Sequence, residues 1–210
     1  MDVIDALKWR YAVKQFDPEK KLSKQQVDLL MEGLCLTATS MGFQLMEFIV
    51  VEHPSLKKKL TPIAYNQSQV EDCSHLIILC RKNKVETKDI QTIIQRTSEV
   101  RGVDINTPQI KGYEQMLSST LKMNYEQQVI WMENQVYIAL GNLMTICAIE
   151  KIDACPMEGF NKEELDEALA LTSKGLKSVV LCAVGYRSEK DKYNGLPKVR
   201  RKKKKLVTYV

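Results

Sequence analysis

The most constraining feature of the sequence is an apolar stretch from Val129 to Ile149, VIWMENQVYIALGNLMTICAI, whose last sixteen residues carry no charge. A surface helix would show one apolar stripe and a polar back, whereas apolar residues here go most of the way round the helix. A membrane span needs about 20 predominantly apolar residues, and this run is shorter and contains Asn134, Gln135 and Asn142. We therefore expect a buried helix of a soluble protein, with the rest of the chain folded around it.

A chain of 210 residues can hardly surround one helix on every side. If residues 136–149 were left exposed in a monomer, the apolar patch would exceed the few hundred Å² that soluble monomers tolerate. We therefore expect part of this helix to contact a second copy of the chain, which predicts a homodimer.

The length allows one large domain or two small ones. A hydrophobic content of 44% and a charged content of 27% are ordinary for a globular protein. Because the sequence shows no internal repeat and no linker, we expect a single domain over residues 1–210. The first ten residues, MDVIDALKWR, contain no uninterrupted apolar segment of the kind that signal peptides carry, so a cytoplasmic location is expected.

The cysteines and histidines do not predict a metal site. The six cysteines, at positions 35, 73, 80, 147, 155 and 182, form no C-x-x-C pair, and several lie in apolar runs. Buried, reduced thiols are expected rather than disulfides or zinc ligands. The dinucleotide-binding, P-loop and G-x-S-x-G motifs are absent from the sequence. An enzyme of this kind would take its chemistry from an organic cofactor.

The pattern of apolar residues predicts an α+β fold. Strands are expected at Glu47–Glu52, Ser74–Cys80 and Leu176–Tyr186, which are β-branched or apolar throughout. The expected helices follow Asp2, Ser23, Pro54, Thr107 and Asn161, cover 88–100, and include the central helix. The segment from Lys151 to Pro156 is predicted to be a turn. The lysines at 57, 58 and 59 are expected to be solvated.

Two basic clusters lie at opposite ends of the chain. Arg10 and Lys14 would share a face of a continuing helix, or line a groove if the segment is extended. The second cluster comprises Lys198, Arg200 and the run 201–205. A solvated surface is the simple interpretation of both. A dianionic phosphate would instead explain why a fold brings them together.

Several segments together resemble the FMN-dependent nitroreductase family, in particular its oxygen-insensitive NAD(P)H nitroreductase and dihydropteridine reductase branch. Each match is weak alone, but their order and spacing are specific and span residues 10–200. The matching pieces are Arg10-x3-Lys14-x-Phe16-Asp17, Thr39-Ser40 with Gln44, Asn66, Trp131-Met132 with Gln135-Val136-Tyr137 and Gly141-Asn142, Pro156-x-Glu158-Gly159-Phe160, and Leu196-Pro197-Lys198-x-Arg200.

The resemblance implies a fold, a cofactor and site residues. The implied fold has a mostly antiparallel sheet flanked by helices, and a homodimer built on the long helix with FMN at its interface. Arg10, Lys198 and Arg200 would bind the phosphate of FMN, and Lys14 would lie near the N1–C2=O edge of the flavin. The other implied FMN-binding positions are Tyr11, Ala12, Thr39, Ser40, Gln44, Asn66 and Gln69. The catalytic group would comprise Lys14, Glu158 and Gly159, with a backbone N–H of Glu158 or Gly159 pointing at flavin N5.

The sequence departs from the family branch at several positions. The branch usually has Ser at Ala12, Asn at Gly42, Pro-Trp at Leu45-Met46 and Lys at Gln69. The first two changes remove expected FMN contacts, and the last leaves Lys14 as the nearby cation. Met41, Met116 and Leu117 are expected to line the substrate face, where relatives commonly have aromatic residues.

The resemblance implies an NAD(P)H-dependent flavin oxidoreductase. NADH or NADPH would reduce the flavin, and a small-molecule acceptor such as a nitroaromatic, quinone or pteridine would then be reduced in a ping-pong cycle. No membrane or nucleic-acid partner is expected. The alternative is a non-enzymatic binding protein of the same fold, with weak or lost FMN and a basic tail that contacts anionic partners. A net charge of +5 is compatible with either.

Overall fold

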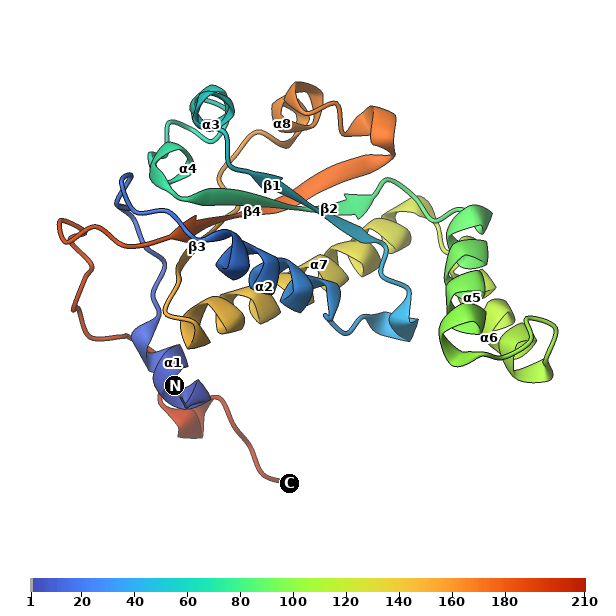
Figure 1. Cartoon of the computed structure of the whole chain (residues 1–210). Helices are drawn as coiled ribbons and strands as arrows, with labels where there is room; N and C mark the ends of the chain where they lie inside the picture. Colours follow the sequence, from blue (N-terminus) through green and yellow to red (C-terminus); the bar gives the residue numbers. More distant parts are fainter. Residues whose placement is uncertain (1) are drawn as a thin grey trace.

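The computed structural model describes residues 2–210 and has a four-stranded sheet at its centre (Figure 1). The strands are β1 (Met46–Val51), β2 (His75–Lys82), β3 (Asp153–Met157) and β4 (Leu176–Gly185). Their order across the sheet is β1-β2-β4-β3, and each neighbouring pair is antiparallel. The expected α+β fold with an antiparallel sheet is therefore confirmed.

The helices lie on both faces of this sheet and beyond one end of it (Figure 1). They are α1 (Val3–Trp9), α2 (Lys24–Cys35), α3 (Pro54–Leu60), α4 (Gln69–Asp72), α5 (Thr87–Arg101), α6 (Pro108–Ser118), α7 (Tyr125–Ile149) and α8 (Lys162–Ala168). Short 3-10 turns are η1 (Ser40–Gly42), η2 (Ser119–Lys122), η3 (Thr172–Lys174) and η4 (Lys203–Lys205). In the part of the chain that the structure describes, no helix is long and apolar enough to cross a membrane.

Residues 76–80 of strand β2 are apolar because both faces of the strand are buried. Leu76 and Ile78 point into the core under α3, α4 and α8, whereas Ile77 and Leu79 point toward α2 and α7. Successive side chains of a strand alternate between the two faces, so a strand covered on both sides cannot show a polar face. A third apolar cluster joins α5 and α6 to the first half of α7.

Helix α7 is positioned by three buried or half-buried amides at a spacing of seven residues. Gln128 accepts a hydrogen bond from the Val85 N–H at 3.0 Å, and the Gln135 side chain accepts one from the Ser40 N–H at 2.7 Å. Asn142 donates to the Gly33 carbonyl at 2.8 Å and to the Thr37 hydroxyl oxygen at 3.0 Å. Residues seven apart lie on one side of a helix. These amides therefore fix the segments that cross α7 on that side.

One stripe of α7 remains open to solvent in the single chain. Ile130 is 61% exposed, Tyr137 41% and Ile138 50%. The opposite side carries Val136, Ala139 and other residues that are fully buried against the sheet. As expected, its own chain covers only part of the surface of α7. The expectation that a second copy covers the rest stays a prediction.

Two local expectations were wrong. The segment Lys151–Pro156 was predicted to be a turn, but the turn ends at Ile152 and Asp153 begins β3, the edge strand beside β4. Pro156 is compatible with an edge strand because its missing N–H is not needed on the open side. The turn instead uses Lys151, which has a positive φ of 58°.

The second correction concerns Lys57, which was expected to be solvated but is 1% exposed. Its ammonium group donates hydrogen bonds to the carbonyls of Cys73 and Ser74. Burial lowers the pKa of Lys57 from its ordinary value. The sequence of lysines 57–59 does not reveal this, because only tertiary packing decides which of the three points from α3 into the protein interior.

Replacing Asn142 by Leu should destabilise the fold. The change leaves the Gly33 carbonyl without this donor, and an unsatisfied buried polar group costs about 1–3 kcal/mol. Gln91→Leu likewise replaces an amide by leucine, at an exposed position of α5 away from the open stripe of α7, and should alter stability by no more than about 0.5 kcal/mol. Urea unfolding at a fixed protein concentration measures both. Equal destabilisation by the two changes would contradict a positioning role for Asn142.

Candidate functional site

The first group of predicted site residues follows α1 in extended conformation. Asp2 caps α1, and the helix ends at Trp9 because Arg10 adopts extended backbone angles (φ −68°, ψ 143°). The chain then runs beside β3, where Ala12 forms a parallel bridge with Ala154. Arg10 and Lys14 therefore do not share a helix face. Of the two arrangements that the sequence left open, the extended one is present.

The segment after β4 returns to this N-terminal segment. We call residues 187–200 the strap. At its start, Arg187 forms an ion pair with Asp153, with nitrogen–oxygen distances of 2.5–3.0 Å. The guanidinium carbon of Arg187 also lies 4.3 Å from the ring centre of Trp9 and 4.5 Å from that of Tyr11. This one arginine therefore joins β3, α1 and the strap.

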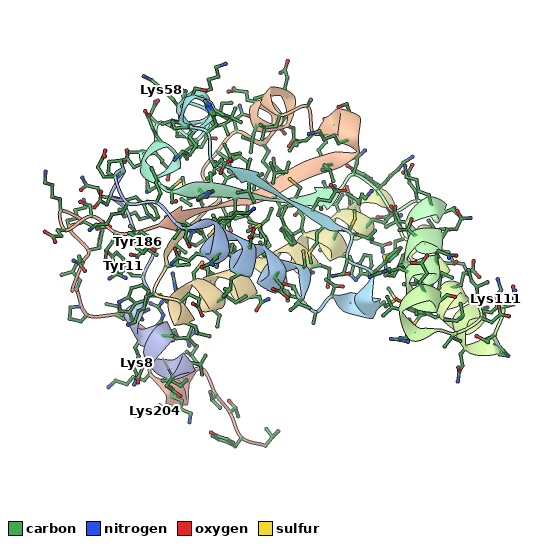
Figure 2. The ribbon with its side chains drawn as sticks, viewed as in Figure 1. Lys8, Tyr11, Lys58, Lys111, Tyr186 and Lys204 are labelled. Carbon is green, nitrogen blue, oxygen red and sulfur yellow. The ribbon has the colours of Figure 1, made fainter. Side chains whose placement is uncertain are left out.

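The two segments enclose an open pocket of about 840 Å³, which we call the basic pocket. Its lining comes from residues 8–12 and Lys14 on one side, and from Arg187 and residues 193–200 on the other. In Figure 2 Lys8 lies at this end of the molecule, as does Tyr11. The structure thus brings together Arg10, Tyr11, Ala12, Lys14, Lys198 and Arg200, which are six of the predicted cofactor-binding residues.

The cations of the basic pocket repel one another. The Nε atom of Arg10 is buried and has no hydrogen-bond partner within residues 2–210. Burial lowers the pKa of Arg10, and the neighbouring Arg200 guanidinium lowers it further. Burial likewise lowers the pKa of Lys198, with smaller contributions from the same two arginines. A buried donor without an acceptor beside like charges is costly, and a bound anion would satisfy it.

Lys198 also has a structural contact. Its ammonium group donates to the Leu7 carbonyl at 2.7 Å and to the carbonyl of Arg10. These carbonyls belong to the C-terminal end of α1, where unpaired acceptors and the helix dipole favour a cation. Lys198 therefore fixes α1 against the strap in addition to adding positive charge to the pocket.

Lys14 also lines the pocket. Its Nζ atom is 3.9 Å from Sγ of Cys155, on β3. Burial raises the pKa of the Cys155 thiol, which Lys14 partly opposes. The hydroxyl of Tyr11 is buried near the Asp191 carboxylate, and burial is the main cause that raises the pKa of Tyr11 to about 12.

Glu158 and Gly159 follow β3 directly and are exposed. The Glu158 carboxylate accepts a hydrogen bond from the Tyr137 hydroxyl at 2.7 Å, which links this loop to α7. The Gly159 carbonyl accepts one from Gln67 at 2.7 Å. Asn66, next to Gln67, is exposed and has a positive φ of 57°, whereas Gln69 is buried at the start of α4.

A second group of predicted residues lies in the loop around η1. The Gln44 side chain donates to the Cys35 carbonyl at 2.9 Å, and the Thr39 hydroxyl oxygen accepts from the Gln44 N–H at 3.2 Å. The Ser40 N–H is bonded to α7, as described above. Met41 has a positive φ of 56° and Gln44 one of 48°, conformations that cost free energy in residues other than glycine and often occur at functional sites.

The predicted substrate-lining residues do not all face solvent. Met116 is 45% exposed and Met41 is half-buried. The Met41 carbonyl accepts a hydrogen bond from the Tyr113 hydroxyl at 2.8 Å, which ties the loop to α6. Leu117 is fully buried in the third apolar cluster, so its expected place on a substrate face is wrong. Helical spacing turns Leu117 inward and Met116 outward.

The two groups lie toward opposite ends of α7 in one chain. Figure 1 shows η1 beside α5 and α6, at the start of α7, whereas α1 and the strap lie at its other end. Figure 2 shows the same separation between Lys111 on α6 and Lys8 on α1. A single chain therefore does not combine the η1 loop with the basic pocket.

Sequence reasoning missed several residues that build the pocket. Arg187, Asp153 and Asp191 position the strap, but they lie in segments predicted to be a turn or an unpatterned tail. No local pattern marks them, because each acts on a residue far away in the sequence. Within residues 2–210, no cluster of three or more His, Cys, Asp or Glu side chains is arranged to hold a metal ion.

Solved structures share the fold of this chain. A nitroreductase-like protein from Streptococcus mutans superposes with a TM-score of 0.85 at 18% identity, covering 100% of this chain and 98% of the other. A structure from Exiguobacterium sibiricum, described provisionally as a nitroreductase in complex with FMN, superposes with a TM-score of 0.84 at 20% identity, covering 100% and 98%. At these identities, the likeness shows the fold alone.

Sequence comparison goes further. A Staphylococcus haemolyticus protein that carries the provisional name NAD(P)H nitroreductase is 34% identical over 197 residues, which cover 90% of each chain. A similarly named protein from Staphylococcus epidermidis is 29% identical and covers 99% of this chain and 96% of its own. The model of the nitroreductase family matches residues 7–186. With its pocket formed from the segments that carry the family's motifs, this chain belongs to the nitroreductase family.

Proposed function

We propose that the protein is an FMN-dependent NAD(P)H oxidoreductase. The observation that carries this proposal is the half-buried Arg10 guanidinium, whose buried Nε atom lacks a partner in the described chain and which lies beside Arg200 in the basic pocket. A dianionic phosphate fits such a site, because guanidinium groups bind phosphate oxygens in pairs. Family membership and the relatives named NAD(P)H nitroreductase support FMN as the compound that carries this phosphate.

The residues of the basic pocket have separate tasks in this proposal. Arg10 and Arg200 bind the phosphate, with Lys198 adding positive charge from the end of α1. Lys14 lies further along the extended segment and contributes a cation near the flavin ring. Bound FMN supplies the hydride chemistry, by which NADH or NADPH reduces a small-molecule acceptor in two successive half-reactions. Glu158 and Gly159 belong to the loop at the end of β3 and complete the catalytic group.

The acceptor class is a nitroaromatic, a quinone or a pteridine. Of the predicted substrate-lining residues, Met41 and Met116 can contact it, because both have solvent-accessible side chains. Another structure with the same fold is named an enone reductase of gut-bacterial fatty acid saturation. The fold therefore accommodates different acceptors, and the side chains at positions 41 and 116 contribute to the choice.

The purified protein tests the proposal directly. It should be yellow with the absorbance of FMN, or should become so on addition of FMN. Anaerobic addition of NADH or NADPH should bleach the flavin, and addition of an acceptor should restore its colour. A protein that neither retains nor binds FMN would instead favour the non-enzymatic binding protein of the same fold.

Arg10→Ala and Arg200→Ala should each weaken FMN binding by about 1.5–3 kcal/mol, the usual contribution of a hydrogen bond to a charged group. The double change Lys203→Ala/Lys204→Ala removes two exposed charges of η4, outside the pocket lining, and should have little effect. Titration of free FMN, followed by flavin fluorescence, measures all three. An equal loss in the η4 variant would show that general positive charge, rather than the pocket, holds the phosphate.

Lys14→Met should lower the midpoint potential of the bound flavin by some tens of millivolts. Reduction places negative charge near N1–C2=O, and a nearby cation stabilises that charge by a few kcal/mol at an effective dielectric constant of about 20. A two-electron couple shifts by about 30 mV for each 1.4 kcal/mol. Redox titration of the FMN-saturated variant measures the effect. An unchanged midpoint would limit Lys14 to a positioning role.

A homodimer belongs to the same proposal. The exposed stripe of α7, with Ile130, Tyr137 and Ile138, supports a second copy as its cover. The separation of the η1 loop from the basic pocket supports it independently, since a second chain can place its η1 loop beside the first chain's pocket. The six cysteines form no disulfide and five are buried, which supports a reducing, cytoplasmic location.

Light scattering tests the dimer. The purified protein should have about twice the mass of the 24.1 kDa chain at micromolar concentration. Ile138→Glu places a charge on the exposed stripe and should shift the protein toward the monomer, because a charge buried without a partner disfavours the contact. A stable wild-type monomer at the same concentration would disprove the proposed dimer.

A further inference from the structure

Asp191 is a buried carboxylate in the middle of the strap. It is 4% exposed, although Lys190 precedes it and Lys192 follows it. Its Oδ2 atom accepts hydrogen bonds from the Lys14 N–H at 2.7 Å and the Gln15 N–H at 3.0 Å. Its Oδ1 atom accepts one from the Tyr193 N–H at 2.9 Å. A single side chain thus holds three backbone donors on two segments.

These bonds keep the carboxylate charged. Burial by itself would raise the pKa of Asp191, but the N–H groups of Tyr193, Lys14 and Gln15 outweigh burial and hold the pKa below its ordinary value. Hydrogen bonds to a charged acceptor are stronger than those between neutral groups. The contact between the two segments is therefore strongest while Asp191 remains ionised.

The position of Asp191 in the strap gives the contact a consequence for the pocket. Arg187 fixes the start of the strap to Asp153, and Lys198 fixes its end to the carbonyls of α1. Between these two ties, Asp191 bonds the backbone of Lys14, 177 residues earlier in the chain. The strap carries Lys198 and Arg200 to the same pocket, so this bond joins the segment that carries Lys14 to the segment that carries Lys198 and Arg200.

We propose that Asp191 is a positioning residue of the cofactor site, which orients the Lys14 backbone and holds the strap closed over the pocket. The proposal rests on the proposed function where it concerns FMN, and on the geometry alone where it concerns the strap. Asp191 itself does not line the basic pocket. It acts through Lys14 on one side and through Lys198 and Arg200 on the other.

Asp191→Asn is the informative change because it keeps the shape of the side chain. Asparagine has one acceptor oxygen, so its amide nitrogen, a donor, must face at least one of the three backbone N–H groups. Glu189→Gln is the matched control. It removes the same charge two residues away, at an exposed position of the same strap.

The first measurement uses flavin-free protein. Limited digestion with trypsin, resolved by mass spectrometry, reports opening of the strap at Lys190 and Lys192. Asp191→Asn should raise the cleavage rate at these sites about tenfold or more relative to the wild type, since a loss of charged hydrogen bonds increases the open population. Glu189→Gln should leave the rate within about twofold, as expected for a surface change without a packing role.

The second measurement uses FMN. Asp191→Asn should raise the dissociation constant of FMN about tenfold or more, whereas Glu189→Gln should not. In FMN-saturated protein, Asp191→Asn should also lower the midpoint potential in the same direction as Lys14→Met. The double variant Lys14→Met/Asp191→Asn should show no larger shift than Lys14→Met alone, because both changes act through one ammonium group.

The outcomes separate this proposal from the proposed function. Faster cleavage with weaker FMN binding and a non-additive potential shift supports it. The proposal is overturned if the strap of Asp191→Asn is cleaved no faster than that of Glu189→Gln. It is also overturned if the strap opens but the affinity for FMN is unchanged.

If the wild type binds no FMN, the proposed function fails, and the role of Asp191 in cofactor binding fails with it. The digestion experiment then still tests whether Asp191 holds the strap. If Asp191→Asn does not fold, Asp191→Glu, which keeps the charge but displaces it, takes its place and should show smaller changes in the same directions.

Discussion

The packing of α7 against one face of the sheet determines where most other elements can lie. Its buried side covers the sheet, and its amides at positions 128, 135 and 142 bind the backbone of the segments that cross it. Apolar burial supplies most of the driving force, at roughly 25 cal/mol per Å². The amides fix the positions of the crossing segments. A buried backbone group must form a hydrogen bond, and only one placement of each segment allows that bond.

The basic pocket results from a different balance. Arg10, Lys198 and Arg200 lie close together where the two ends of the chain meet. Their burial and mutual repulsion cost free energy, and the same two effects lower the pKa values of Arg10 and Lys198. The fold holds them together through contacts that carry opposite charge or accept hydrogen bonds: Asp153 to Arg187, Asp191 to the backbone of Lys14, and the carbonyls of α1 to Lys198. In the proposed function, these contacts arrange the pocket in advance for the phosphate of FMN.

The separation of the site residues within one chain links this pocket to the assembly. The η1 loop is fixed by Gln135 and Tyr113 near the start of α7, and the basic pocket lies near its end. In the proposed homodimer, a second copy of the chain covers the exposed stripe of α7 and also completes the site. Stability and cofactor binding would then depend on the same contact, so protein concentration would affect both.

The sequence by itself determined most of the elements and the family. The uncharged run 134–149 predicts the buried helix, and the β-branched runs predict β1, β2 and β4, because local periodicity records which faces are buried. The family motifs identified Arg10, Lys14, Lys198 and Arg200 as site residues, and the structure brings these four residues to one pocket. Only the tertiary structure decided that Asp153 begins an edge strand, that Lys57 is buried, and that Asp191 binds Lys14. These features depend on partners far away along the chain, and no local pattern of residues contains that information.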